Sequence, residues 1–404
     1  MFFDFSFKSS LLFFFFLHGL VFSALLLIKG IQNENRAARW LGCFTILSSL
    51  YIAPFMLGYA GWYSKAPYRD ILFYVPFQQL FLLPPVLYFY IRSLLDKSFL
   101  FSKKELVHFI PAGFYFLYSL IVFMVDKVVP GEIFFYKDGK DKDFSTGYQV
   151  AGFILFGFYL IMSLSTYRKY KRITYDAVSF ADSVMFKWAQ RFLIAFLLLL
   201  TIRGLFFILN PEWDEFGKKF WYYICFSILF YYISVSGYAN TVRSVISFKD
   251  SPFIPVGDIV PDEGPPVHKS PLSIVTNEQD AAPDQKEMLP DLTDWKKAIE
   301  QLMLVDKLYE NPELTLADMS AQLGTHPKKV SQVINQGFHM NFNDFVNHYR
   351  AKAVIQKIEE GEHTVQTLLS IGFECGFNSK STFNRAFKRY TSLTPKEYIE
   401  KHHS

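Results

Sequence analysis

The sequence predicts an all-α protein: a polytopic bundle of seven membrane helices, followed by a cytoplasmic all-α domain with two helix-turn-helix units. The chain is 51% hydrophobic and contains 46 Phe and 24 Tyr, which is more apolar and aromatic material than a water-soluble chain of this length requires. Further along, continuous apolar runs give way to helical periodicity. The predicted domains are a seven-span sensor domain (1–250), a Pro-rich flexible linker (251–290) and a double helix-turn-helix domain (291–404).

Seven apolar stretches in the first 250 residues reach the length that crosses the hydrocarbon core of a bilayer, about 17 to 25 residues. Tyr and Trp cluster at their ends, as they do at membrane interfaces. Buried helices of a large soluble core are the alternative, but seven in succession with short polar connectors argue against it. The predicted spans are 11–29, 39–60, 71–95, 106–125, 148–166, 188–209 and 220–240.

Lys and Arg are distributed unequally between the two sets of connectors. They are more frequent after the first, third, fifth and seventh spans, with a dense cluster at 168–172, whereas the other connectors are richer in acids. By the positive-inside rule, the N-terminus lies outside and the C-terminal domain lies in the cytoplasm. No small-residue cleavage site follows the first span, so a removed signal peptide is disfavoured. We expect a multi-pass protein of the bacterial cytoplasmic (inner) membrane.

Four polar residues interrupt the predicted spans: His18, Gln78, Gln79 and Arg203. An intramembrane charge is a functional candidate by default, and the Pro-Pro pair after the glutamines breaks a helix in a way that can line a cavity. No Asp or Glu lies mid-span to neutralise Arg203, so we expect an outward-facing pocket for a small anionic ligand. The alternative is that Arg203 extends to the interface and the glutamines hydrogen-bond neighbouring helices.

The first helix-turn-helix unit lies near residue 320. Thr315 to Asp318 reads as a capping box that opens a short helix, and Gly324 ends it because glycine tolerates the left-handed conformation. Pro327 suits the first turn of the next helix, where its missing N–H costs nothing. The apolar face of that second helix is formed by Val330, Val333 and Ile334.

The same arrangement returns further along the chain. A short helix is predicted over 364–373, followed by a turn at Gly376 and a helix from Ser379 to Tyr390. The apolar face of the short helix is formed by Val365, Leu368, Leu369 and Phe373. A long helix over 341–359 joins the two units, and Thr394 to Glu397 opens a last helix. One solvent-facing strip of the second unit carries Lys380, Ser381, Asn384, Arg385 and Lys388.

These runs resemble the C-terminal signature of AraC/XylS-type transcription regulators. The resemblance covers roughly residues 295 to 400 and is closest in 376–390 (GFNSKSTFNRAFKRY) and 393–398 (LTPKEY). It implies double-stranded DNA as a partner, with each unit placing its second helix in a major groove. One departure is Gly372, where the family usually has Ala. Because Gly costs about 1 kcal/mol in a helix interior, we expect that helix to be looser or slightly displaced.

The resemblance also assigns roles to single residues. The base-reading positions fall on Lys328 and Gln332, with Lys329 beside them, and in the second unit on Lys380, Ser381 and Arg385. Arg and Lys donate to guanine, Gln pairs with adenine and Ser serves either. Lys388 and Arg389 suit phosphate contacts, and Asn384 shares their strip. Residues 291–404 hold 14 Lys+Arg and 14 Asp+Glu, so non-specific DNA affinity should be modest.

The remaining features set limits on function. There is no Gly-rich phosphate loop and no His pair at metal-ligand spacing, so we expect no enzyme activity, cofactor or metal. A linker such as 251–290 spans on the order of 35 Å and transmits rigid-body motion poorly, which favours control by homodimerisation of the membrane domain. The expected function is a membrane-bound one-component transcriptional regulator. The alternative is a membrane receptor or transporter whose cytoplasmic tail binds a protein partner.

Overall fold

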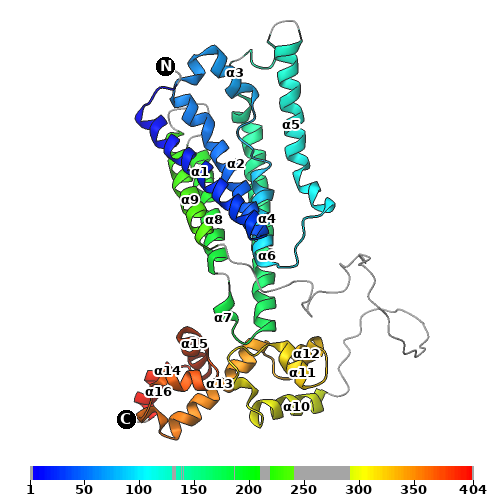
Figure 1. The fold of residues 1–404 in the computed structure, drawn as a ribbon, viewed down its shortest axis with the longest axis vertical. Coiled ribbons are helices and arrows are strands. Elements are labelled where there is room, and N and C mark those ends of the chain that lie inside the picture. Colours follow the sequence, from blue (N-terminus) through cyan, green and yellow to red (C-terminus); the bar gives the residue numbers. More distant parts are fainter. Residues whose placement is uncertain are drawn as a thin grey trace, which may run out of the picture. The chain divides into compact units, whose positions relative to one another are not determined.

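The computed structural model describes residues 3–129, 133–137, 139, 141–185, 187–209, 219–240 and 292–402 (Figure 1). The predicted linker lies outside these residues. The chain forms two compact units: the membrane unit is 1–171 with 186–248, and the head is 172–185 with 249–404. No β-strand occurs among the described residues, as the predicted fold class requires. The sequence did not suggest that 172–185, between two predicted spans, belongs to the head.

The membrane unit contains six helices that are long and apolar enough to cross a bilayer. The six are α1 (Phe7–Gln32), α2 (Arg36–Tyr59), α5 (Ile110–Phe123, extended by η2 at Lys103–Phe109 and η3 at Met124–Val128), α6 (Thr146–Ala177), α8 (Lys187–Leu209) and α9 (Phe220–Ala239). Several of them carry large apolar side chains that face outward: Phe114 of α5 and Ile154 and Ile161 of α6 are each exposed by about two thirds (68%, 65% and 68%). A helix with such a surface is stable in lipid rather than in water.

The third predicted span, 71–95, is wrong as a single helix. It is divided between α3 (Ala66–Tyr74) and α4 (Leu83–Leu95), with non-helical backbone over 75–82. Proline has no N–H to donate and clashes with the preceding turn. Pro76 therefore stops helix formation, and the Pro-Pro pair is tolerated only in the first turn of α4. The shorter elements of this unit are η1 (Trp62–Ser64) and η4 (Lys142–Phe144).

The head is built from eight α-helices and two short 3-10 turns among the described residues. The capping box at Thr315 is confirmed: its hydroxyl accepts from the Asp318 amide at 3.2 Å, and its own amide donates to the Asp318 carboxylate at 2.9 Å. The elements are α7 (Ala181–Val184), α10 (Leu292–Leu304), η6 (Leu308–Glu310), α11 (Leu316–Gln322), α12 (Pro327–Gly337), α13 (Phe342–Glu359), η7 (Glu362–Thr364), α14 (Leu368–Glu374), α15 (Lys380–Thr391) and α16 (Pro395–His402).

One helix of the head begins later than the sequence predicted. The helix expected over 364–373 is α14, which starts after Thr367, whose hydroxyl accepts the Ser370 amide at 3.1 Å. Val365 therefore precedes the helix and is 89% exposed, and Phe373 is also largely exposed. Thr367 was a better cap than Thr364 because its side chain reaches the third residue of the helix.

The head has two apolar cores that share one helix. Phe345 and Val346 of α13 pack with α10, α11 and α12, while Val354 and Ile358 of the same helix pack with α14 and α15. Because α13 contributes to both cores, it fixes the two helix-turn-helix units to each other within the head.

Candidate DNA-binding interface

The outer face of α15 carries the five polar residues that the sequence placed on one strip. Phe383 and Phe387 are buried, with 2% and 0% exposed, and they hold the opposite face against the second core. Ser379 caps the helix by accepting the Thr382 amide at 3.2 Å. The exposed residues of this face are Lys380, Ser381, Asn384, Arg385 and Lys388. All five have side chains that donate to base edges or phosphates.

The corresponding face of α12 is less open. Lys328 is exposed, but Lys329 and Gln332 are half-buried. The Lys329 ammonium lies 3.9 Å from the centre of the Trp295 ring, a cation–π contact that holds it against α10. Two of the three residues of α12 that were predicted to contact DNA therefore expose only part of their side chains.

Glycines make the tight turns before both recognition helices. Gly324 has a φ of +60° and Gly376 a φ of +87°, in the left-handed region that favours glycine. A Cβ at position 376 would also lie 2.2 Å from the Tyr309 carbonyl oxygen. Gly376 therefore brings the start of the second recognition helix against the first unit, where a side chain has no room.

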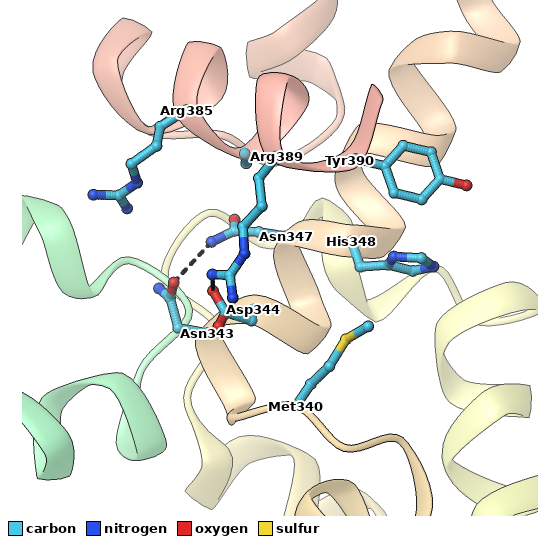
Figure 2. A pocket seen from close by; sticks show the side chains of 9 residues that line it. Met340, Asn343, Asp344, Asn347, His348, Arg385, Arg389 and Tyr390 are labelled. Atoms are coloured by element: carbon cyan, nitrogen blue, oxygen red, sulfur yellow. Dashed lines mark hydrogen bonds and ion pairs between the residues drawn. The ribbon is translucent and has the colours of Figure 1, made fainter. Parts of the chain in front are cut away.

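A cavity of about 240 Å³ lies between α13 and α15 (Figure 2). The Arg389 guanidinium crosses it to form an ion pair with Asp344, so this arginine, expected to contact phosphate, is engaged within the head. Beside it, the Asn347 amide donates to the Asn343 side-chain oxygen at 3.1 Å. The lining residues are Met340, Asn343, Asp344, Asn347, His348, Arg385, Ala386, Arg389 and Tyr390.

The apolar spacing of α13 did not reveal that its arginine is buried. Arg350 is 1% exposed and donates to the Tyr309 carbonyl at 2.8 Å and the Asn311 carbonyl at 2.6 Å. Burial lowers the pKa of Arg350 to about 9, so the guanidinium stays protonated at neutral pH. A buried charge needs hydrogen-bond partners for its donors. Arg350 finds them in the backbone carbonyls of Tyr309 and Asn311, and so holds the segment between α10 and α11.

Arg385, one of the residues predicted to read bases, forms an ion pair with a residue that lies outside 292–402. That residue is Asp182, whose side chain is 13% exposed. No feature of the sequence connects these two residues, because 182 lies between two predicted membrane spans.

The residues of the predicted ligand pocket lie in three different surroundings in the membrane unit. Arg203 donates to the side-chain oxygen of Gln149 at 2.9 Å, and the Gln149 amide donates to Gln78 at 2.9 Å. Gln79 instead donates to a nearby backbone carbonyl, that of Pro76. His18 pairs with Ser234 at 2.7 Å, between α1 and α9. The structure thus brings Arg203 and Gln78 together through Gln149, which the sequence analysis had not singled out.

A larger cavity of the membrane unit, about 1300 Å³, is lined mainly by the connectors and helix ends between α2 and α6. Tyr63, Tyr115 and Tyr148 contribute rings to it, and Asp141 and Lys142 contribute ionisable side chains. Burial, reinforced by the neighbouring Asp143, raises the pKa of Asp141 well above its usual range. The chemistry of this cavity is therefore aromatic, with a carboxyl group that burial drives toward its neutral form.

Two capped helix pairs, each ending in a helix with an exposed polar face and joined by one shared helix, define a double helix-turn-helix domain. Residues 319–401 match the sequence model of a helix-turn-helix domain family. The C-terminal domain is therefore an AraC-type helix-turn-helix domain, and the resemblance found in the sequence is confirmed.

Curated relatives also carry the name of helix-turn-helix regulators. Uncharacterized HTH-type transcriptional regulators of Staphylococcus aureus strains COL, MSSA476 and N315 are each 27% identical over 92 residues. The aligned region is 23% of this chain and 12% of each relative, so the similarity covers a small part of both proteins. No solved structure matches the chain.

Proposed function

We propose that this chain is a membrane-bound one-component transcriptional regulator, with its N-terminus outside and its head in the bacterial cytoplasm, and that the segment containing α3 and α4 makes the seventh crossing beside the six long helices. The head binds double-stranded DNA sequence-specifically through α12 and α15. The membrane unit senses a cue, either a small molecule or a property of the membrane, and controls that binding.

The observation that carries this proposal is the outer face of α15. Its five exposed polar residues have no apolar neighbour on that face, and the buried Phe383 and Phe387 fix its orientation. Arg385 and Lys380 suit guanine, and Lys388 suits a phosphate. In a double helix-turn-helix domain, this helix and α12 would enter major-groove segments about one helical turn apart.

The second part of the proposal concerns control. The six long apolar helices support anchoring in the membrane, and the Arg203–Gln149–Gln78 hydrogen bonds provide a buried polar site that a cue could rearrange. Two membrane units that associate would raise the local concentration of two heads on adjacent DNA sites. An unchanged oligomeric state between active and inactive protein would rule out this form of control.

Genome-wide crosslinking of the tagged full-length chain in its host tests DNA binding. Discrete peaks that share a sequence motif are expected, together with their loss in Arg385→Ala. Lys396→Ala is the matched control, since it removes an equal charge from an exposed position in α16 and should keep the peaks. Absent peaks, or peaks unaffected by Arg385→Ala, would favour the receptor or transporter whose tail binds a protein.

The predicted pocket has its own test. Arg203→Gln and Gln79→Ala are each expected to change the response of the most strongly bound promoter to the cue, while the protein stays in the membrane. If both variants respond like the natural chain, these residues only hold helices together and the cue acts elsewhere.

A further inference from the structure

Residues 172–185, which comprise the last turns of α6 and the segment after it, belong to the head. Val178 forms an antiparallel bridge with Thr315, and the Ser179 amide donates to the Leu314 carbonyl at 3.0 Å. The segment thus pairs with the strand-like residues that lead into α11. Backbone hydrogen bonds of this kind fix its register on the head.

Ser179 is the anchor of this segment. Its carbonyl accepts from the Asn343 amide at 2.8 Å and the Asn347 amide at 3.3 Å. Arg350 donates to the same carbonyl at 3.4 Å and to the Ser179 hydroxyl at 3.0 Å. The three donors lie on one face of α13, at most 5% exposed, and Ser179 itself is fully buried. Buried donors of this kind require acceptors, so α13 carries a surface that fits an extended backbone.

From this anchor the segment reaches the second recognition helix. Asp182 pairs with Arg385 of α15, and the other oxygen of its carboxylate accepts the Tyr175 hydroxyl at 2.8 Å. The Ser183 hydroxyl lies 3.0 Å from the side-chain oxygen of Asn378, just before α15 begins. The segment therefore contacts the second helix-turn-helix unit at two places: at Asn378, just before α15 begins, and at Arg385, which is expected to contact a base.

We propose that residues 178–183 compete with DNA for the head, so that the chain carries its own inhibitor. This inference rests on the proposed function, because it needs α15 to bind DNA. The Asp182 carboxylate takes up donors of the Arg385 guanidinium that a guanine would otherwise use. The segment 172–185 also contains two Asp and one Arg, a net charge of −1 that opposes the approach of phosphates.

The connectivity of the chain couples this contact to the membrane unit. Helix α6 begins in the membrane unit and ends, at Ala177, one residue before the bridge with Thr315. A change that moves the end of α6 reaches Ser179 and Asp182 within a few residues, without passing through 251–290. By linkage, DNA binding must in turn release the segment and act back on α6.

A reversible covalent lock tests the competition in the full chain. Ser183→Cys with Asn378→Cys places two thiols where two side chains already touch. The protein is held in lipid nanodiscs and probed with a pool of random-sequence DNA duplexes, with bound duplexes counted by sequencing. We expect the oxidised protein to lose at least about three quarters of its DNA and to recover it on reduction. Ser183→Cys alone controls for oxidation of the natural cysteines.

A charge variant tests the same point without a crosslink. Asp182→Asn is expected to retain about threefold more duplex than the natural chain, in line with the loss of one partly exposed ion pair. Asp176→Asn is the matched control: it removes an equal charge from the same segment but its salt-bridge partner is Arg172, not a residue of α15. It should leave retention unchanged.

The outcomes separate the two proposals. If the locked and reduced forms bind DNA equally, or Asp182→Asn and Asp176→Asn behave alike, the competition is overturned while DNA binding stands. If the disulfide forms but no form of the protein retains duplex, the proposed function fails and the competition falls with it. DNA retention that depends on reduction and on Asp182 supports both.

Discussion

The two recognition helices of the head are built alike on their buried sides and differently on their outer sides. Helix α12 is held by Val330, Val333 and Ile334, and α15 by Phe383 and Phe387, all at most 2% exposed. Outside, α15 presents a continuous polar strip, whereas α12 presents Lys328 beside two half-buried residues. The shared fold positions both helices, but the side chains on their outer faces decide how much polar surface each helix can offer to DNA.

The neighbours of the two helices differ in origin as well. Lys329 of α12 rests on Trp295, within the C-terminal domain, while Arg385 of α15 is paired with Asp182 from the connection between α6 and α8. If residues 178–183 compete with DNA as proposed, the first contact stays in place when DNA binds and the second is exchanged. We therefore expect α12 to bind DNA in the same way whether or not the Asp182 pair is present, as a constant reader, and α15 to be the reader that this pair controls.

The largest loss of stability is expected at Gly376, where the two helix-turn-helix units of the head meet. Alanine there would need a φ of +87° and would place its Cβ 2.2 Å from the Tyr309 carbonyl oxygen. Gly376→Ala should lower the free energy of unfolding of the head by at least about 3 kcal/mol, because strain and backbone overlap add. Pulse proteolysis of the full chain in nanodiscs, read with a C-terminal tag, measures it.

Gly361→Ala is the control for this prediction. Its φ is +84°, but a Cβ would meet nothing within 4 Å. It should cost only the conformational strain of about 1–2 kcal/mol. Equal losses in the two variants would show that Gly376 is needed for its backbone conformation alone and that the contact with Tyr309 contributes nothing.

The elements of the head were predictable because their signals are local. Capping residues such as Thr315 and Ser379 mark helix starts, and apolar spacing marks the buried face within one turn of the chain. The start of α14 was placed too early because the apolar spacing over 364–373 does not show where the helix is capped. Thr367 supplies the cap, and Leu368 and Leu369 directly after it pack against the second core.

The contacts that combine distant segments could not be predicted in this way. Asp182 and Arg385 are separated by about half the chain, and nothing in either local sequence requires the other. Gln149 likewise lies at the edge of a predicted span, where a polar residue is ordinary. Its role emerges only when α6 and α8 place it beside Arg203. Hydrogen-bond partners of buried charges are a property of the assembled fold.

A double-mutant cycle tests whether the Asp182 pair affects DNA binding by Arg385 of α15 but not by Lys328 of α12. On a duplex enriched from the random pool, Arg385→Ala should reduce affinity roughly tenfold in an Asp182→Asn background, the loss of one base contact. In the natural chain the reduction should be smaller, because the substitution also removes the Asp182 pair. Lys328→Ala should reduce affinity by the same factor in both backgrounds. Coupling of Lys328 to Asp182 would contradict the distinction.

Within α12 itself, adjacent lysines should behave differently. Lys328→Ala is expected to lower the slope of log affinity against log salt by up to about 1, because it removes an exposed positive charge from the face that meets the charged duplex. Lys329→Ala should lower the slope by less and instead destabilise the head by about 0.5–1 kcal/mol, the size of a partly exposed cation–π contact. Trp295→Leu should reproduce that loss of stability. Equal slopes for the two lysine variants would show that Lys329 leaves its ring to bind DNA.

The smallest change in stability is expected at Gly372, where the family that the sequence resembles usually has Ala. Glycine was expected to loosen the helix, yet in α14 it is buried, and a Cβ would lie 3.1 Å from the Phe383 ring. That ring is held between Phe377 and Phe387, at centroid distances of 5.3 Å and 5.9 Å, so it has little room to yield. Overpacking of about 1–3 kcal/mol then opposes the helix propensity gained from Ala, about 1 kcal/mol.

Gly372→Ala should therefore destabilise the head slightly, by roughly 1 kcal/mol. The sign should reverse in a Phe383→Leu background, where the smaller side chain leaves room for the methyl group and only the propensity gain is left. Pulse proteolysis of the four proteins gives both differences. Stabilisation by Gly372→Ala in the natural background would mean that the second core adapts easily. The position of α15, and with it the reading face that Asp182 contacts, would then be set by the helix caps more than by the packing of Phe383.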